Sequence, residues 1–213
     1  NKPKKIFTSS SNFSDDIFKI WLAEQKKNGS KLFCGQHGSQ FINKFCTNDF
    51  YAEKTCDKIL TWGDRIGEGK KYFSVGNFKT ISKKVEIKNK KFISVIQDMP
   101  TKYSIRLWSG IDMCNYKDYI NLQNIFLNNL NKDNYSKVKI RYGSPPSTYA
   151  VNNLIELERK TWLSNHPKLH YETRDINIYS TLENSYLTIL TNVTSTLLLE
   201  CISFNIPLLI FTP

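Results

Sequence analysis

The sequence predicts an α/β fold in which strands and helices alternate along the chain. Short apolar runs rich in β-branched residues recur, and amphipathic stretches lie between them. Clusters of glycine, proline and asparagine mark the ends of both kinds of segment. Strands that alternate with helices form βαβ units, so they are expected to pair in parallel.

Residues 1–82 are expected to form a first domain. The segment 13–29 is predicted to be a helix because Ile17, Ile20 and Leu22 recur at helical spacing and Gly29 suits its end. The further elements expected in this domain are a strand at 31–34, a helix at 49–59, and strands at 59–62 and 72–77. A basic stretch around residues 80–90 separates this series from the next one.

Residues 83–213 are expected to form a second domain with a doubly wound sheet. The segment 116–131 is predicted to be an amphipathic helix with Tyr119, Leu122 and Phe126 on one side. The strands expected here lie at 91–98, 137–143, 169–173, 186–193 and 207–211. The other helices expected lie at 148–165, 175–185 and 195–205.

Composition indicates a globular protein, since hydrophobic residues make up 40% of the chain. No apolar run is long enough to span a bilayer, and the first residues contain no secretory signal. We therefore expect a cytoplasmic location. The chain does not begin with methionine and ends beside a predicted strand, so we expect it to be incomplete at both ends.

The net charge of +11 is compatible with several classes of partner. The lysine-rich run at 83–91 is interrupted by Val85 and Ile87, which favours a solvated strand or linker, with contact to an anionic membrane or polymer as the alternative. No zinc knuckle, aromatic RNA-binding box or basic-leucine pattern is present, so we expect no nucleic-acid partner.

Five widely spaced cysteines without a CxxC pair favour reduced thiols over a disulfide framework. Cys34 and His37 lie close in sequence, but no second ligand pair or orienting carboxylate motif accompanies them. We therefore expect no metal and no cofactor. The segment 67–70, "GEGK", lacks the spacing of a phosphate-binding P-loop, and no GxGxxG follows a strand.

Polar residues follow several predicted strands, where doubly wound sheets bind their ligands. The clearest case is the start of the last helix, where Ser195 and Thr196 stand beside free backbone N–H groups that suit a phosphate or carboxylate. Arg141, at the end of a neighbouring strand, could hold the same anion. Glu200 is a carboxylate in an otherwise apolar helix. The alternative is that Ser195 and Thr196 only cap the helix.

The stretch "CGQHG" at 34–38 follows the first predicted strand. One interpretation is a tight turn in which His37 is incidental. The other is that Gly35, Gln36 and Gly38 keep the backbone accessible to a ligand and place His37 beside it.

Three segments carry a resemblance to a known family: "GQHGSQF", "CDKILTWGD" and "ILTNVTSTLLLECISFNIPLLIF". In this order they resemble a family of bacterial surface-polysaccharide transferases, related to capsule and ulosonic-acid transferases. The similarity covers roughly residues 31–78 and 90–213. Residues 194–200, "TSTLLLE", have a less aromatic lead-in to the Ser-Thr pair than that family's pattern. The resemblance implies a GT-B architecture, with two Rossmann-like domains facing each other across a cleft.

The resemblance also implies a function: transfer of a sugar from a nucleotide donor during lipopolysaccharide or capsule synthesis. The donor it suggests is a CMP-activated nonulosonic or ulosonic acid, and the acceptor is a glycan or a lipid-linked glycan. The enzyme would work without a metal and could contact the anionic inner face of the membrane.

The resemblance gives each candidate residue an expected role. Ser195, Thr196 and Arg141 are expected to hold the donor phosphate, and Glu200 the nucleoside or its surroundings. His37 is expected to act as general base on the acceptor or to bind the donor's carboxylate, and Asp64 is the alternative base.

Two other functions stay open. One is a nucleotide-sugar epimerase using Asp64 or Glu68, and the other is a non-catalytic basic module that binds anionic polysaccharide or membrane.

Overall fold

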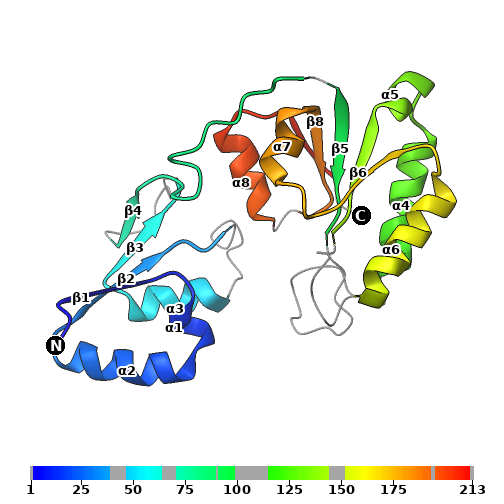
Figure 1. The fold of residues 1–213 in the computed structure, drawn as a ribbon. Coiled ribbons are helices and arrows are strands. Elements are labelled where there is room, and N and C mark those ends of the chain that lie inside the picture. The colour runs from blue at the N-terminus through cyan, green and yellow to red at the C-terminus, as the bar shows by residue number, and fades with distance from the viewer. Residues whose placement is uncertain are drawn as a thin grey trace. The chain divides into compact units, whose positions relative to one another are not determined.

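The computed structural model describes residues 2–38, 47–63, 71–89, 91–98, 115–143, 152–192 and 195–211. The chain divides into two compact units, residues 1–83 and 84–213, which we call unit 1 and unit 2. Each unit contains one parallel sheet flanked by helices, as Figure 1 shows. The predicted α/β class with parallel sheets is therefore confirmed. Asp64 and Glu68 lie outside the described residues.

Unit 1 holds a parallel sheet whose strands lie in chain order, β1-β2-β3-β4. These strands are β1 (Lys5–Thr8), β2 (Lys31–Gly35), β3 (Lys58–Thr61) and β4 (Tyr72–Ser74). The helices described in this unit are α1 (Ser11–Ser14), α2 (Asp16–Lys27) and α3 (Thr47–Thr55). The sequence predicted every one of these elements except β1 and α1.

The helices of unit 1 pack on one face of its sheet (Figure 1). Because side chains alternate along a strand, Ile6, Leu32 and Ile59 all point to this face, where Leu22 of α2 and Ala52 of α3 cover them. The strands are all added in the same direction, and right-handed crossovers then place every connecting helix on the same side.

Unit 2 holds a five-stranded parallel sheet in the order β7-β6-β5-β8-β9. Its strands are β5 (Phe92–Ile96), β6 (Val138–Arg141), β7 (His170–Glu172), β8 (Ser185–Leu190) and β9 (Leu208–Ile210). Its helices are α4 (Tyr116–Asn128), α5 (Lys132–Ser136), α6 (Asn152–Asn165), α7 (Ile178–Glu183) and α8 (Thr196–Ser203). Only α5 was not predicted.

The sheet of unit 2 is covered on both faces, as expected of a doubly wound domain (Figure 1). One core contains Tyr119 and Leu127 of α4 and Trp162 of α6, packed on Ile93 and Ile140. The other core lies under α7 and α8. Burial on both faces fits the largely apolar sequences of β5 and β8, which lie side by side inside the sheet.

The winding of the sheet in unit 2 reverses between β5 and β8. The chain goes from β5 outward through β6 to β7, then returns to add β8 and β9 on the other side of β5. Ligands in doubly wound sheets bind beyond the carboxyl ends of the strands at such a reversal. The residues after β5 and β8 are therefore the first place to look for a site.

Two further findings concern predictions from composition. The three cysteines in the described ranges, Cys34, Cys56 and Cys201, are buried and form no disulfide, in agreement with the expected reduced thiols. Among the helices that the structure describes, none has the length and apolar character needed to cross a bilayer.

Candidate functional site at the strand reversal of unit 2

A buried polar network joins the carboxyl ends of β5 and β8. The Tyr119 hydroxyl of α4 lies 2.6 Å from Thr191 Oγ1 and donates to Gln97 Oε1 at 2.9 Å. Thr191 in turn donates to the carbonyl of Ile96 at 2.8 Å. Burial raises the pKa of Tyr119, so this phenol stays protonated and serves as a fixed hydrogen-bonding centre.

This network positions Asp98 at the edge of the sheet. The Asp98 amide donates to Tyr119 Oη at 3.1 Å and to Thr191 Oγ1 at 3.2 Å. Its carboxylate accepts from Asn192 Nδ2 at 2.6 Å, which ties the segment after β5 to the segment after β8. A carboxylate held beside an amide in this way can accept hydrogen bonds from hydroxyl groups.

The next polar group is the start of α8. Ser195 is the N-cap, and its hydroxyl accepts from the Leu197 amide at 3.2 Å. The capping interpretation is thus confirmed for Ser195. Thr196 is the first residue of the helix, so the backbone N–H groups of this turn and the positive end of the helix dipole lie beside both hydroxyls. An anion-binding role for the pair stays a prediction.

Arg141 lies in an internal ion pair and not at the start of α8. Its Nη1 donates to Glu172 Oε1 at 2.6 Å and to Thr181 Oγ1 at 3.0 Å, and its Nη2 donates to the Ile176 carbonyl at 2.7 Å. The side chain is 6% exposed. Since these partners account for both terminal nitrogens, the structure favours a role in fixing the loop after β7, and we no longer assign Arg141 to the donor phosphate.

Glu172 is the carboxylate on which this ion pair is centred. Lys139 Nζ also contacts it, at 3.1 Å from Oε2. Burial alone would raise the pKa of Glu172, but hydrogen bonds from Thr181, Arg141 and Lys139 outweigh it and hold the pKa below its usual value. Glu172 is therefore ionised at neutral pH and pairs with the buried Arg141 and the half-buried Lys139.

The structure points to a different arginine, Arg174, in the loop that follows β7. Its side chain is exposed to solvent. Desolvation lowers the pKa of the guanidinium; the charge of Asp98 opposes this effect, and that of Arg141 adds to it. The charge of Asp98 thus acts on the Arg174 guanidinium. The sequence analysis overlooked it, although its position just after a predicted strand was a usable signal.

Glu200 is buried in α8, with 1% of the residue exposed. Its Oε2 accepts from the Tyr179 hydroxyl of α7 at 2.9 Å. Burial and the nearby Glu200 carboxylate together raise the pKa of Tyr179 to about 12. The hydrogen bond between Tyr179 and Glu200 therefore joins α7 to α8. This contact supports a structural role for Glu200, in which it holds α8 in place, and not direct contact with a nucleoside.

The "GQHG" loop of unit 1 is organised by Gln36. Its backbone N–H donates to the Leu60 carbonyl, its Oε1 accepts from the Trp62 amide at 2.8 Å, and its Nε2 donates to the Gly38 carbonyl at 2.7 Å. These bonds tie the end of β2 to the end of β3. They leave His37 exposed at the turn, next to Gly38 with a φ of 62°. His37 is thus accessible, as a substrate-facing residue must be.

The structure explains the glycine at position 35 differently from our prediction. A Cβ atom built at Gly35 would lie 2.8 Å from Cζ of Phe7. The glycine therefore makes room for the Phe7 ring of β1, whereas we expected it to make room for substrate. The sequence could not show this, because β1 was not predicted.

Replacing Gly35 with alanine is expected to lower the free energy of unfolding by about 1 kcal/mol, since the new methyl must displace the Phe7 ring. Urea denaturation followed by circular dichroism measures the change. In a Phe7→Ala background the same replacement should cost much less. An equal cost in both backgrounds would show that Phe7 is not the obstacle.

No group of three or more histidine, cysteine, aspartate or glutamate side chains with metal-binding geometry occurs among the residues that the structure describes. Metal independence stays a prediction.

Two α/β units with parallel sheets, one of them with a polar carboxyl edge at a strand reversal, define the general class of this protein. The chain belongs to the LIC12162 family of transferases, whose family model matches residues 1–213. This finding confirms the expected transferase class.

A search of curated proteins found no match. Among solved structures, the chain is similar to one in the crystal structure of accessory secretory protein 1, 2 and 3 in Streptococcus pneumoniae, with 15% sequence identity and a TM-score of 0.45. The match covers 97% of this chain and 39% of that one, so the chain spans less than half of that relative's length.

Proposed function

We propose that this protein is a glycosyltransferase that binds a nucleotide sugar at the carboxyl edge of unit 2. The observation that carries the proposal is the strand reversal at β5 and β8, where Asp98, Asn192 and the start of α8 come together. Membership of a transferase family supports the reaction class. The GT-B pairing, with unit 1 on the acceptor side, is part of the proposal.

In this proposal the start of α8 and Arg174 hold the donor phosphate. Backbone N–H groups, the helix dipole and a guanidinium all favour negative charge. Asp98 accepts hydrogen bonds from sugar or ribose hydroxyls.

The reaction transfers the anomeric carbon from the phosphate oxygen to an acceptor oxygen. The acceptor hydroxyl attacks this carbon, and the bond to the nucleotide phosphate breaks with its electron pair retained by the phosphate. The cationic edge stabilises the charge that develops there, so no metal ion is required. We assign the acceptor proton to His37 or to Asp64, with binding of the donor's carboxylate as the other role open to His37.

We further propose that the donor is a CMP-activated nonulosonic or ulosonic acid and that the acceptor is a surface glycan or its lipid-linked form. These details come from the resemblance in "GQHGSQF" and "NVTSTLLLE". The net charge of +11 suits an acidic sugar or the anionic inner face of the cytoplasmic membrane.

A thermal-shift panel of CMP, UDP, GDP and their sugar conjugates tests the proposal. At a concentration of about 100 Kd the correct ligand adds about 2.7 kcal/mol, which raises the melting temperature by on the order of 5–10 °C. Ser195→Ala should lower the melting temperature of the free protein slightly and reduce the ligand-induced rise.

Conversion of the donor without an acceptor would instead indicate an epimerase. Salt-sensitive binding of anionic polymer without any nucleotide effect would indicate a binding module.

A further inference from the structure

The second face of the sheet in unit 1 carries a repeated pattern of lysine and apolar side chains. β1 begins Lys-Ile-Phe, β2 begins Lys-Leu-Phe and β3 begins Lys-Ile-Leu. In each strand the middle residue points into the core described above. The first and third residues therefore share the opposite face.

The strand register places these side chains in an ordered array. Lys5 pairs with Lys31, Phe7 with Phe33, and Phe33 with Lys58. One step further along, Gly35 pairs with Leu60, and Leu60 pairs with Phe73 of β4. Lys5 and Lys31 thus form a cationic amino end of this face. Phe7, Phe33, Leu60 and Phe73 form an apolar band, and Lys58 lies level with Phe7 and Phe33 beside this band.

The apolar band is exposed to a degree unusual for a parallel sheet. Phe7 is 59% exposed and Phe73 is 38% exposed, while Phe33 and Leu60 are half-buried. All three helices described in unit 1 pack on the other face. Parallel sheets are normally covered on both faces, so this face has the composition of a docking surface.

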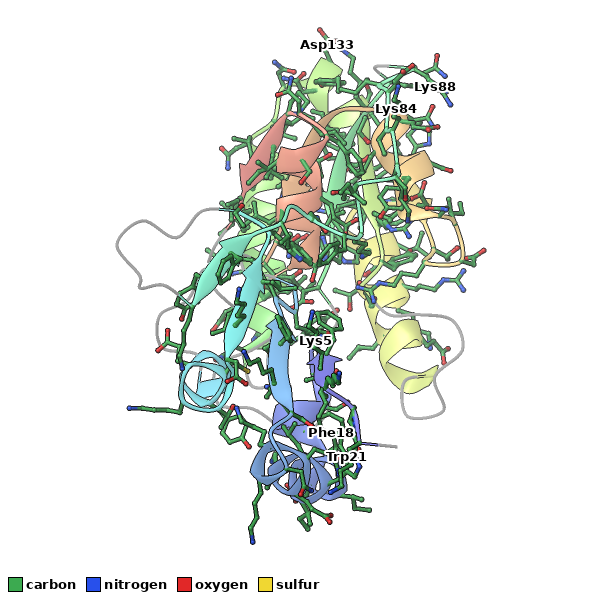
Figure 2. All side chains as sticks on the ribbon, turned by 90° about the vertical axis from the view of Figure 1, so that its left-hand side faces the viewer. Lys5, Phe18, Trp21, Lys84, Lys88 and Asp133 are labelled. Carbon is green, nitrogen blue, oxygen red and sulfur yellow. The ribbon has the colours of Figure 1, made fainter. Side chains whose placement is uncertain are left out.

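The three lysines determine the chemistry of the partner. Lys5, Lys31 and Lys58 are exposed, and Lys58 Nζ lies 4.1 Å from the centroid of the Phe73 ring. Lys5 is labelled in Figure 2. The nearby Asp57 carboxylate is already paired with Lys26 at 3.0 Å and accepts from the Leu32 amide at 2.7 Å. A partner of this face therefore needs both an apolar stripe and negative charge at one end.

An amphipathic helix meets these requirements. Helices that cover parallel sheets run antiparallel to the strands, which places their C-terminal ends beside the amino ends of the strands. The C-terminal end of a helix is the negative end of its dipole, and it would lie against Lys5 and Lys31, with Lys58 within reach of the acidic side chains of its last turn. We propose that the face formed by these lysines with Phe7, Phe33, Leu60 and Phe73 docks an amphipathic helix of a partner protein, with acidic residues in its last turn.

Two other occupants fit less well. A flat lipid bilayer matches a twisted sheet poorly, whereas a helix follows the twist. A second copy of this chain could offer the exposed stripe of α2, Ile17, Ile20 and Trp21. However, the last turn of α2 carries Lys26 and Lys27, which would face the lysines of the docking surface.

The test uses a synthetic helical peptide of about 16 residues, long enough to form a helix on binding. Leucines recur at every third or fourth position, and glutamates occupy its last turn. A control peptide of the same composition has the glutamates in its first turn. We expect the first peptide to bind the 213-residue chain more tightly than the control, as measured by fluorescence anisotropy.

Matched variants locate the binding surface. The triple variant Lys5→Glu, Lys31→Glu, Lys58→Glu should weaken binding at least about tenfold, because three attractive contacts become repulsive. The control is Lys27→Glu, Lys84→Glu, Lys132→Glu, which changes the net charge equally at other exposed positions. Phe73→Ser should also weaken binding, whereas Phe78→Ser, at an exposed phenylalanine outside the face, should not. Circular dichroism confirms that each variant is folded.

The possible results distinguish the occupants. Equal binding of both peptides, or binding unaffected by the triple variant, would overturn the proposal. Failure of the peptide to bind, with lysine-dependent binding to phosphatidylglycerol vesicles, would assign the face to a membrane. Self-association of the chain that Phe73→Ser abolishes would assign it to a second copy. None of these measurements depends on the proposed transferase activity.

Discussion

Replacing Glu172 with alanine is expected to lower the free energy of unfolding of unit 2 by about 3–5 kcal/mol. This is the largest stability effect that we expect in this protein. The reason is that Arg141 and Lys139 would then be two cations without their carboxylate, at positions where 6% and 12% of their side chains are exposed. Urea denaturation followed by the circular dichroism signal measures the loss.

The control for this prediction is Glu183→Ala. Glu183 pairs with Lys88 at 3.2 Å, but the lysine is 63% exposed. Exposed ion pairs contribute about 0–1 kcal/mol, so this change should be small. Similar losses for Glu172→Ala and Glu183→Ala would contradict the assignment of Glu172 as the centre of a buried ion pair.

Glu172 also makes the free energy of unfolding of unit 2 depend on pH. Because the folded pKa of Glu172 lies below its usual value of 4.5, the unfolded state binds more protons in this range, and stability rises with pH there. The contribution of Glu172 is therefore fully present above its unfolded pKa and is lost as the pH falls through its folded pKa. The difference in stability between the protein and Glu172→Ala should narrow as the solution is acidified below about pH 4.5.

Arg174→Ala is expected to weaken nucleotide-sugar binding by about 10–100-fold, the effect of losing a charge-assisted hydrogen bond to a phosphate. Isothermal titration with the nucleotide identified in the thermal-shift panel measures the affinity. Stability should change little, since the Arg174 side chain is exposed.

Two variants sharpen this prediction. Arg174→Lys keeps the charge but loses the two-pronged geometry of the guanidinium, so it should restore only part of the affinity. Lys132→Ala removes an exposed charge elsewhere in unit 2 and should have no effect. Unchanged affinity in Arg174→Ala would remove this residue from the proposed phosphate site, and the start of α8 would have to hold the phosphate without it.

The sequence predicted most elements of both sheets, because their strands are apolar on one or both faces and their helices are amphipathic. It did not predict β1, since Lys5–Thr8 is a four-residue strand preceded by further lysines. That strand completes the sheet face with the lysine pattern. The pattern becomes visible only when the register is known.

Prediction of the site was less complete. Ser195 was found because a serine followed by an apolar run marks a helix start. The roles of the two arginines were not separable, since Arg141 and Arg174 both lie at or just after strand ends. The deciding fact is the register, which places Arg141 beside Glu172 across β6 and β7. Asp98 was overlooked because its importance comes from Asn192, 94 residues later in the chain.

The strand orders of the two sheets have a consequence for how each unit forms during synthesis. In unit 1 each new strand pairs with the one made just before it, so the sheet can grow as the chain emerges from the ribosome. In unit 2 the central strand β5 pairs on one side with β8. Ile93 of β5 can therefore pair with Leu187 only after β8 has been synthesised. One edge of β5 therefore stays unpaired over most of the translation of unit 2, which makes this stage the one at which the nascent chain most needs protection from aggregation.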